Sequence, residues 1–382
     1  MHSRTRLTLA VAVVTYFVVS GLAIGGRGAA QQVGGVPPPG QNAGQFFKNV
    51  TTSTLKTLSV DDFITAMGVI SDDLGLDCAD CHPNAGTDQA DFVVDTPIKK
   101  TARRMVEMVA NINKQNFGGA QMVTCWTCHH QRMIPATTIS LDRLYDTPNM
   151  EEADVVEQEK GGPTADKVFA DYIQAIGGEQ KAAAIKSYIA EGTSVGYAGL
   201  GGDAKFTIYA EAPNKRTTEI TYPDHPDRGT SLWAFDGMTG WVKTPRALLT
   251  EYELTGDGLD AARFEAYAGF PTELKGAAMN WRVGRRSIGD SDYLAVQGNG
   301  PKGFLVTLYF DPKTHLLFRM LRLQPLPVGR GPVQTDYGDY RAVNGVKLPF
   351  DYNFKWLDGR YEAKIKDYKV NVPIPAATFG KH

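Results

Sequence analysis

Cysteine is scarce in this sequence. The 382 residues contain only four, Cys78, Cys81, Cys125 and Cys128, and these fall in two short stretches. No cysteine is therefore left for another purpose, and none follows the N-terminal segment to carry a lipid. Nucleophilic triads, phosphate-binding loops and nucleic-acid-binding motifs are absent as well. The sequence thus gives no support to a hydrolase, a nucleotide-dependent enzyme or a nucleic-acid-binding protein.

Net charge is also low, at −2, but the two halves differ. Residues 31–163 hold 17 acidic against 10 basic residues, which gives −7, whereas residues 164–382 hold 25 against 27. An acidic first half repels nucleic acid and attracts a basic protein partner, although it also serves solubility alone. Apolar residues make up 42% of the chain, enough for ordinary cores in two domains.

The first thirty residues have the pattern of an export signal. A basic start, MHSRTR, precedes an apolar run from Leu7 to Ile24 and the small residues Gly28-Ala29-Ala30. We expect cleavage after Ala30 and a periplasmic or extracytoplasmic location. Because the apolar run approaches the ~20 residues that span a bilayer, an uncleaved membrane anchor stays open as an alternative. Residues 31–45 have the Gly, Pro and Gln content of a flexible tether.

The four cysteines form two copies of one motif. Residues 76–83 read LDCADCHP and residues 124–130 read TCWTCHH. A disulfide framework or a zinc site of four thiolates is one interpretation, but zinc pairs usually lie roughly 15 to 20 residues apart and here 43 intervene. Neither explains the histidine after each pair. With 7 His in 382 residues, both would occur by chance about 3 times in 10,000, from (7/382)².

Covalent attachment of c-type haem requires this histidine. Each thiol adds to one vinyl group of the porphyrin, and the imidazole that follows binds the iron. The sequence therefore predicts two covalently bound haems c. Their expected anchors are the four cysteines, and their expected proximal iron ligands are His82 and His129.

A methionine helix precedes the first motif. Ser59 and Asp62 open it with a capping pattern, and its apolar stripe is Phe63, Met67, Ile70 and Leu74. A turn at residues 75–77 then lets the chain double back, so that helix and motif can lie on opposite faces of one porphyrin. We expect Met67 to be the sixth iron ligand. The alternative is that it is an ordinary core residue.

A second helix precedes the second motif. Thr96 caps it, Pro97 occupies its first turn, and it ends before Gly118-Gly119. Its expected apolar stripe is Ile98, Ala102, Met105, Val109 and Ile112, with Met108 on the edge. Met105 is the preferred sixth ligand and Met108 the alternative. Met122, Met133 and Met150 lie in nearby loops and stay open.

This repeated helix, methionine and CxxCH unit resembles the cytochrome c subunit of photosynthetic reaction centres and its non-photosynthetic dihaem relatives. The resemblance covers roughly residues 45–133. It implies methionine ligation from the preceding helix, and for one haem of that family a distant histidine, for which His130, His225 and His315 are the candidates here. This chain departs from that family in having two motifs instead of four and no lipid-bearing cysteine, so the resemblance implies electron transfer and not photosynthesis.

The second half reads as a β-rich domain. After an acidic, glycine-ended linker at 135–163, residues 164–382 begin with a helix over 165–176 and continue as eight or more alternating strands. The turn dipeptides include Asp236-Gly237, Asp311-Pro312, Asn344-Gly345 and Asp358-Gly359. We expect an antiparallel meander closed into a half-barrel with one or two packed helices, the second near 258–268. The order resembles the LolA-like lipoprotein-carrier half-barrels, which implies an apolar concave face. A folded spacer filled by its own aromatic residues is the alternative.

The predicted fold class is therefore α+β with two domains, a small helical dihaem domain at 46–134 and the β half-barrel at 164–382. The predicted function is electron transfer between redox protein partners through two six-coordinate haems, without enzymatic activity. Two alternatives stay open. One is a dihaem peroxidase, and the other is a carrier of lipid or quinone in the C-terminal half with an attached redox module.

Overall fold

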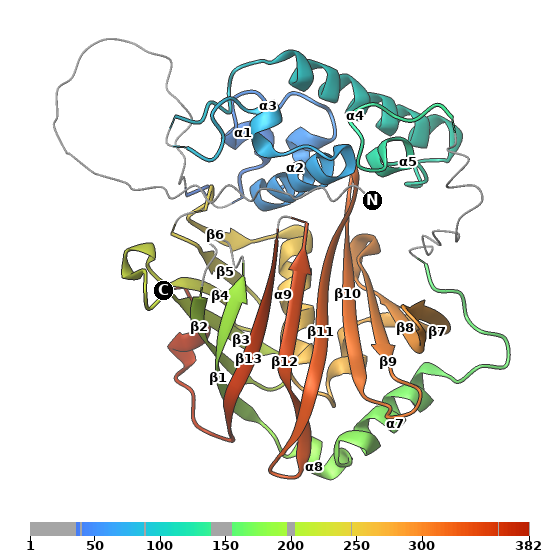
Figure 1. Cartoon of the computed structure of the whole chain (residues 1–382), viewed down its shortest axis with the longest axis vertical. Coiled ribbons are helices and arrows are strands. Elements are labelled where there is room, and N and C mark those ends of the chain that lie inside the picture. Colours follow the sequence, from blue (N-terminus) through green and yellow to red (C-terminus); the bar gives the residue numbers. More distant parts are fainter. Residues whose placement is uncertain are drawn as a thin grey trace, which may run out of the picture.

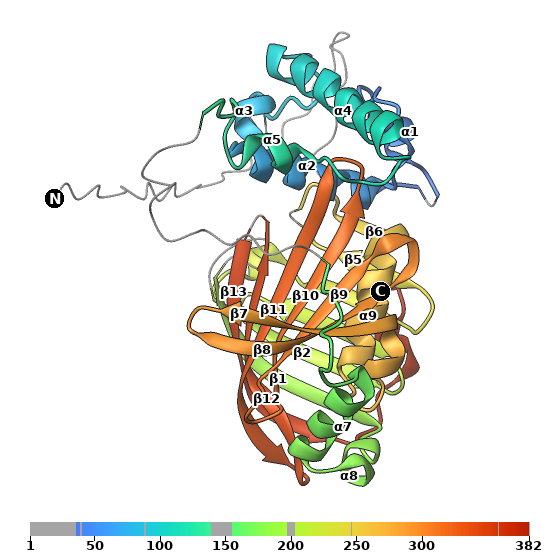
Figure 2. The same ribbon diagram turned by 90° about the vertical axis from the view of Figure 1, so that its right-hand side faces the viewer.

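The computed structural model describes residues 36–138, 155–196 and 203–381, apart from 39, 88, 246 and 358. A layer of helices lies across one end of a strongly curved sheet (Figures 1 and 2), which confirms the predicted α+β class. The expected export signal lies outside the described residues. None of the described helices has both the length and the apolarity that crossing a membrane requires.

Helix α2 (Val60–Leu74) begins and ends where local chemistry dictates. The Ser59 hydroxyl accepts a hydrogen bond from the Asp62 N–H at 3.1 Å, which satisfies one of the helix's unpaired donors. At the other end Gly75 adopts the left-handed conformation with φ 64°. Glycine takes this conformation without the Cβ penalty that other residues meet. The predicted start of this helix is thereby confirmed.

Helix α4 (Pro97–Asn116) follows the same logic. The Thr96 side chain accepts from the Lys99 N–H, proline occupies the first turn, and Gly118 and Gly119, both with positive φ, follow its end. Shorter elements complete the helical part: α1 (Ala43–Phe46), η1 (Leu55–Thr57), α3 (Cys78–Cys81) and α5 (Cys125–His129).

The faces that α2 and α4 bury differ from the expected apolar stripes. The buried residues of α2 are Val60, Asp62, Ala66, Val69 and Asp73. Those of α4 are Lys99, Val106, Val109 and Asn113. Met67 and Met105, at the centres of the expected stripes, are only half-buried. Val109 is buried as expected, but otherwise each buried face is displaced by about one residue from the expected stripe. The methionine-bearing stripes therefore stay partly uncovered by protein.

In the described residues the sheet has thirteen strands in the order β6-β5-β4-β3-β2-β1-β13-β12-β11-β10-β9-β8-β7, and every neighbouring pair is antiparallel. Pairing of β1 with β13 joins two consecutive meanders into one curved sheet, with β6 and β7 at its edges. The strand bounds are β1 (Ser187–Gly196), β2 (Asp203–Glu211), β3 (Lys215–Thr221), β4 (Ser231–Phe235), β5 (Gly240–Lys243), β6 (Glu251–Leu254), β7 (Met279–Ile288), β8 (Ser291–Asn299), β9 (Leu305–Phe310), β10 (Leu317–Leu326), β11 (Gly329–Val343), β12 (Val346–Trp356) and β13 (Gly359–Val370).

The predicted turn dipeptides join consecutive strands. Asn344 and Gly345, with φ 48° and 80°, link β11 to β12, as expected for a two-residue hairpin. Asp236-Gly237 links β4 to β5, and Asp311-Pro312 lies between β9 and β10. Asp358 is outside the described residues. These turns set the register and keep the inward-facing side chains of successive strands on one concave face.

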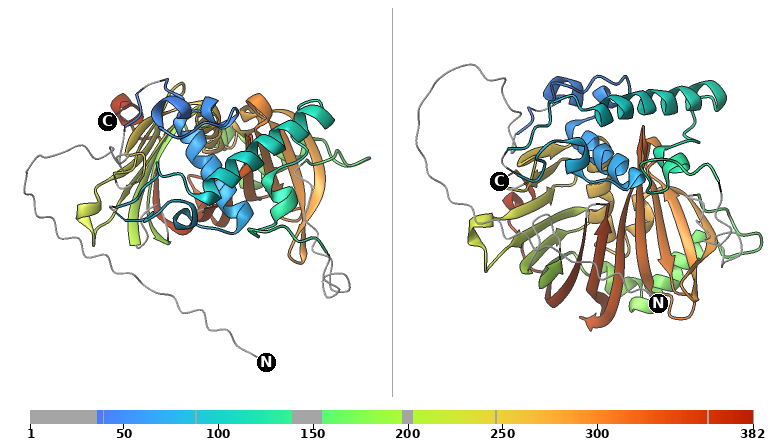
Figure 3. Two further views of the ribbon diagram at one scale, coloured as in Figure 1. Left: turned by 90° about the horizontal axis from the view of Figure 1, so that it is seen from above. Right: turned by 45° about the horizontal axis from the view of Figure 1, so that its top comes forward.

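Three helices accompany the sheet. These are α7 (Ala165–Ile176), α8 (Glu179–Ala183) and α9 (Gly256–Ala268). Helix α9 connects the two edge strands and contacts β3, β4 and β10, while α7 contacts β7 and β12 (Figure 3). The main core lies between these helices and the concave face. Short 3-10 turns occur at η2 (Pro226–Arg228), η3 (Leu274–Ala277), η4 (Pro301–Gly303) and η5 (Ala376–Phe379).

The turn between β10 and β11 projects into the helical layer (Figure 1). Leu326 and Val328, at its two sides, belong to the same buried cluster as Val69 of α2 and Cys125 of α5. The Val328 carbonyl also accepts a hydrogen bond from the Cys125 N–H at 3.0 Å. The second CxxCH motif is therefore held partly by the sheet.

The start of α2 also packs against the start of α9. A Cβ on Gly256 would lie 2.7 Å from Asp62 Oδ2, and one on Gly258 would lie 2.8 Å from Asp61 Oδ2. Gln324 of β10 donates to Asp62 Oδ1 at 2.8 Å. Both carboxylates thus face the N-terminal turn of α9, whose unpaired N–H groups and helix dipole favour negative charge. Burial nevertheless raises the pKa of Asp61 above its usual value.

Candidate haem site

Both CxxCH motifs fold as the same capped helical turn. In α3 the Asp77 carboxylate accepts from the N–H groups of Ala79 and Asp80 at 2.8 and 3.2 Å, and the Asp80 side chain accepts from the Asp77 N–H at 2.8 Å. In α5 the Thr124 hydroxyl accepts from the Thr127 N–H, and the Thr127 hydroxyl accepts from the Thr124 N–H. Each motif therefore carries its own capping box immediately before and within the cysteine pair.

This turn determines where the cysteines point. Residues i and i+3 of a helix lie on one face, so each turn presents its two thiols on the same side. All four cysteines are free thiols. Cys78 and Cys128 are exposed, Cys81 is half-buried and Cys125 is buried. A paired, partly accessible set of thiols fits attachment to two vinyl groups of one porphyrin.

Burial keeps two of the thiols protonated. Burial, with the nearby Asp73 carboxylate, raises the pKa of Cys125 to about 12. Burial and the neighbouring Asp80 also raise the pKa of Cys81. In the described part of the chain, moreover, no three His, Cys, Asp or Glu side chains converge to hold a metal ion.

His129 is oriented as an iron ligand would be. Its Nδ1 lies 2.8 Å from the carbonyl oxygen of Arg132, to which it donates in the neutral tautomer with hydrogen on Nδ1. That tautomer leaves the Nε2 lone pair available to a metal, and such a backbone contact is the usual second partner of a metal-bound imidazole. His129 therefore fits the role predicted for it.

His82 is held as a neutral imidazole by a different environment. Burial, with the nearby Lys99 charge, lowers its pKa to about 4. Its ring lies 5.0 Å from that of Phe92, and its buried Nδ1 has no hydrogen-bond partner among the described residues. The neutral form is the one that binds iron. His82 therefore has the protonation state, though not the backbone contact, of a ligand.

The candidate sixth ligands occupy different environments. Met67 packs against the buried cluster that contains Cys125. On α4, Met105 is half-buried and Met108 is 41% exposed. Met122 and Met133 are 62% and 53% exposed, and Met150 lies outside the described residues. The structure thus leaves both α4 methionines as candidates.

The contacts between helices and motifs cross. The end of α2 meets the second motif, because the Asp73 carbonyl accepts from the Gln131 N–H at 2.9 Å. The start of α4 meets the first motif, because the Thr96 hydroxyl donates to the Cys81 carbonyl at 3.3 Å. The predicted order of helix, turn and motif is present twice. In space, however, each helix also contacts the motif of the other unit.

The alternative histidines lie apart from the motifs or face solvent. His130 is exposed and its ring lies 5.2 Å from that of Trp126. His225 is exposed beside η2. His315 lies in the turn before β10, and the ten residues of that strand place it about 30 Å from the Leu326 end that meets α2. We therefore retain methionine as the expected sixth ligand.

Several large apolar side chains near the motifs are exposed, beside the two buried clusters of the described helical part. These are Val94, Met108, Phe117, Met122, Met133 and Ile134. A porphyrin bound by the motifs would cover such surface. Free paired thiols, neutral histidines, thioethers and uncovered apolar faces together fit haem c.

Comparison with known proteins agrees with this reading. Residues 27–171, which contain both motifs, match the family model described as photosynthetic reaction centre cytochrome C subunit. The resemblance predicted for residues 45–133 is thereby confirmed, since the matched residues include all of that region. No curated protein sequence matches the chain.

Solved structures resemble the sheet part at low identity. A LolA superfamily protein from Nitrosomonas europaea is 14% identical, with a TM-score of 0.39, covering 58% of this chain and 99% of that one. A DUF1329 family protein from Desulfovibrio piger is 11% identical, with a TM-score of 0.39, covering 57% and 98%. An outer membrane lipoprotein-sorting protein domain from Vibrio parahaemolyticus is 9% identical, with a TM-score of 0.35, covering 51% and 89%.

Proposed function

We propose that the chain is an exported dihaem c-type cytochrome that passes electrons between protein partners. The observation that carries this proposal is the duplicated, identically capped CxxCH turn within the region that matches the reaction-centre cytochrome family. Haem iron supplies reversible one-electron exchange when it is bound. The rest of the proposal concerns what the protein's own residues contribute.

The residues divide into anchors and iron ligands. The four cysteines fix two porphyrins, and His82 and His129 are the proximal ligands. Met67 is the sixth ligand of one haem, and Met105, with Met108 as the alternative, is that of the other. A thioether ligand among apolar walls raises the reduction potential relative to two histidines, so these methionines set the range in which the protein works.

Ligation of both irons on both sides makes the protein a carrier and not an enzyme, because no coordination position stays open for substrate. A dihaem peroxidase is the enzyme-class alternative, and it needs one iron that becomes five-coordinate. Addition of hydrogen peroxide to the reduced and half-reduced protein distinguishes the two. We expect no ferryl spectrum, and its appearance would favour the peroxidase.

The expected partner is a basic redox protein outside the cytoplasm. Residues 57–98, which surround the first motif, contain nine Asp and no Lys or Arg. Among them Asp77, Asp80, Asp91 and Asp95 are exposed. Backbone hydrogen bonds lower the pKa of Asp91, and a hydrogen bond from Arg103 lowers that of Asp95, so both are ionised at neutral pH. Such a face steers a basic partner and repels nucleic acid. Electron exchange should therefore slow as salt increases.

A redox titration of the purified protein, with low-temperature spectra, tests the proposal most directly. We expect two one-electron transitions and low-spin, six-coordinate spectra. Changing Cys78 and Cys81 together to Ala should leave one covalent haem by mass. A wild-type protein that matured in a host with cytochrome assembly yet lacked a Soret band would refute the proposal.

Single substitutions on α4 identify the ligand of the second haem. Met105→Ala and Met108→Ala are matched, since each removes one thioether from the same helix. The variant that removes the ligand should lose a sulfur-to-iron absorption band near the red end of the spectrum and lower one of the two potentials. The other variant should change neither. If neither variant changes the spectrum, the ligand lies elsewhere.

A further inference from the structure

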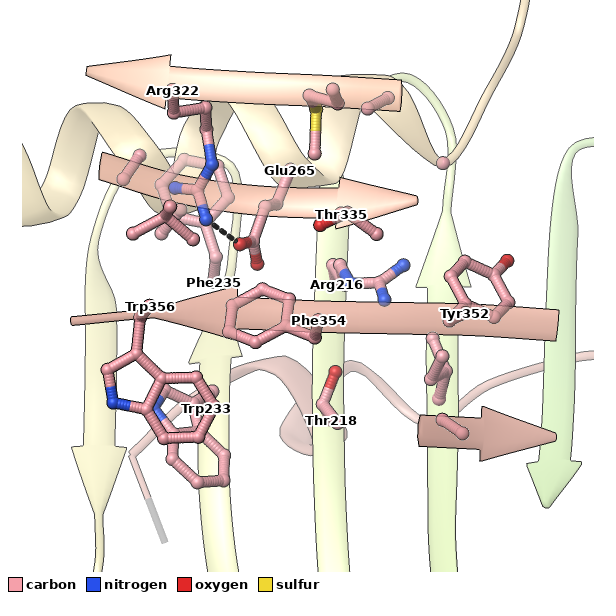
Figure 4. Close-up of a pocket in the computed structure, with 18 of the residues that line it drawn as sticks. Arg216, Thr218, Trp233, Phe235, Glu265, Arg322, Thr335, Tyr352, Phe354 and Trp356 are labelled. Carbon is pink, nitrogen blue, oxygen red and sulfur yellow. Dashed lines mark hydrogen bonds and ion pairs between the residues drawn. The ribbon is translucent and has the colours of Figure 1, made fainter. Parts of the chain in front are cut away.

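The concave face of the sheet encloses a cavity of about 570 Å³, within the ~300–1,000 Å³ range of small-molecule sites. Helix α2 forms part of its wall through Ile64, Thr65 and Gly68, and α9 forms another part. Most of the lining side chains are aliphatic or aromatic, and the aromatic ones include several tyrosines. Figure 4 shows Trp233, Phe354 and Trp356 gathered on one side of the cavity, with Arg216 and Tyr352 toward the other.

Three ionised side chains stand out in this lining. Of the described residues that line the cavity, only Arg216, Glu265 and Arg322 carry charge at neutral pH, two positive and one negative. Arg322, whose side chain is 6% exposed, forms an ion pair with Glu265 (Figure 4). Burial raises the pKa of lining tyrosines such as Tyr337 and Tyr352, which keeps them neutral. The cavity therefore holds one positive charge in excess.

Arg216 carries that excess charge. Its Nη1 donates to the Tyr188 hydroxyl at 3.2 Å, and its Nε has no hydrogen-bond partner among the described residues. A guanidinium stays protonated at any physiological pH. Arg216 is half-buried, and against the effect of burial Tyr188 and the Glu265 charge both raise its pKa. Glu265, however, is shared with Arg322. One carboxylate therefore faces two guanidiniums, and a further anion in the cavity would be favourable. Tyr188 accepts this bond through its oxygen, so its own hydrogen is left to donate to a further group.

We propose that the cavity binds an amphiphile whose anionic head, a carboxylate or phosphate, pairs with Arg216 and Tyr188. Its apolar chain lies along Trp233, Phe354 and Trp356. A planar guanidinium pairs with either anion through two parallel hydrogen bonds. The sequence leaves a lipid or a quinone open as the ligand of the C-terminal half. The positive charge favours an amphiphile with an anionic head, because a neutral head would leave the excess charge uncompensated.

The register of the strands gives the orientation of the ligand. Trp356 is the last residue of β12, and the next residue, Leu357, packs against the cluster that contains Val69 of α2. In the register of β3 with β4, Arg216 lies opposite Phe235, the last residue of β4, whereas Thr218 lies opposite Trp233. The head therefore sits deep in the sheet, and the chain points toward α2.

Binding to the haem-containing, full-length protein, freed of lipid by a hydrophobic resin, tests this proposal. The probes are hexadecanoate, hexadecyl phosphate and hexadecanol, which share one chain and differ in the head. Isothermal titration should show that one or both anions bind at least about tenfold more tightly than the alcohol, as expected for hydrogen bonds to a charged group. The stronger anion then identifies the head.

Arg216→Gln should remove this preference, and Lys215→Gln is the matched control. The two residues are neighbours on β3, but Lys215 does not line the cavity and pairs instead with Glu211. Arg216→Gln should weaken anion binding at least about tenfold and leave hexadecanol binding unchanged. Lys215→Gln should change neither. If Arg216→Gln also lost hexadecanol binding, Arg216→Lys, which retains the charge, should keep the preference for the anion.

Several outcomes would overturn the proposal. These are equal binding of anion and alcohol by the wild-type protein, unchanged preference in Arg216→Gln, lost preference in Arg216→Lys, and tighter binding of a neutral quinone such as decylubiquinone than of either anion. None of these results bears on the number, ligation or potentials of the haems. The ligand site and the electron-transfer proposal can therefore fail separately.

Discussion

Replacement of Gly75 by Ala should loosen the second CxxCH motif more than the first. Gly75 ends α2 with φ 64°, a conformation that costs an L-residue roughly 1–2 kcal/mol. A Cβ there would also lie 2.4 Å from the carbonyl oxygen of Gln131, a backbone atom just beyond the second motif. Relief of that overlap must shift backbone, and overpacking of this kind costs typically about 1–3 kcal/mol. Ala also stiffens the unfolded chain, which reduces the net conformational penalty to about 1 kcal/mol, so the expected total is about 2–4 kcal/mol.

Gly118→Ala separates the cost of the backbone conformation from the cost of the overlap with Gln131. Gly118 follows the end of α4 with nearly the same φ, 61°, but a Cβ there would meet nothing within 4 Å. It therefore reports the conformational penalty alone, about 1 kcal/mol after the gain from a stiffer unfolded chain. Guanidinium unfolding followed through the Soret band should give a lower midpoint for both variants at an unchanged slope, with the larger shift in Gly75→Ala.

The spectra should differ as well as the stabilities. The Asp73 carbonyl, two residues before Gly75, accepts from the Gln131 N–H, so displacement of Gln131 also strains that hydrogen bond. We expect Gly75→Ala to broaden the absorption of one haem and Gly118→Ala to leave both unchanged. Equal midpoints for the two variants would refute the reasoning, because the contact with Gln131 would then contribute nothing.

Four further substitutions test other parts of the structure. Met67→Ala should abolish the sulfur-to-iron band of one haem and lower its potential, and an unchanged spectrum would remove Met67 as a ligand. Asp61→Asn should stabilise the protein increasingly as pH rises above about 4. Because burial raises the pKa of Asp61 in the folded state, its favourable contribution is complete below the unfolded pKa and is lost as pH rises through the folded pKa. Urea midpoints measured between pH 4 and 8 should show this divergence, and a constant difference would contradict it. Val328→Ala and Val346→Ala each truncate a fully buried valine and should each cost about 1–3 kcal/mol, yet only Val328, in the cluster with Cys125, should perturb a haem spectrum.

The helix boundaries and the motifs were predictable because their signals are local. Ser59 and Thr96 cap their helices within three residues, and Gly75 ends α2 through its own backbone conformation. The CxxCH pattern likewise carries its chemistry within five residues. In the second half, alternation and turn dipeptides such as Asn344-Gly345 predicted the meander for the same reason. Such features need no knowledge of what packs against them.

The buried faces of α2 and α4 were not predictable in the same way. An apolar stripe indicates which side of a helix avoids water, but not whether protein or cofactor covers it. Ala66 and Val69 are buried because the β10–β11 turn, more than 250 residues away in sequence, packs there. Met67 is left half-covered by that same arrangement. The rotation of both helices is therefore a result of long-range contacts.

The charged lining of the cavity did leave a signal in the sequence. Met320, Arg322 and Gln324 alternate on β10, as do Arg216, Thr218 and Ile220 on β3, and all six line the cavity. An arginine at an inward position of an otherwise apolar alternation is costly unless it has a partner. Alternation alone could not reveal that Arg322 forms an ion pair with Glu265 of α9, and that Arg216 shares the charge of the same carboxylate.

The sheet part of the chain helps to hold the second CxxCH motif in place. Cys125, an expected haem anchor, donates its N–H to Val328 and shares a buried cluster with Leu326, so the second motif is held by two segments about 200 residues apart. Closing such a long loop costs entropy that grows only with the logarithm of its length, and the buried contacts at the seam offset that cost. The first motif has a different support, since Thr96 and Lys99 of α4 lie beside it. Unfolding of the sheet should therefore release the surroundings of the second CxxCH motif while those of the first persist. Haems bound at the two motifs, as we propose, would then report differently on the same unfolding.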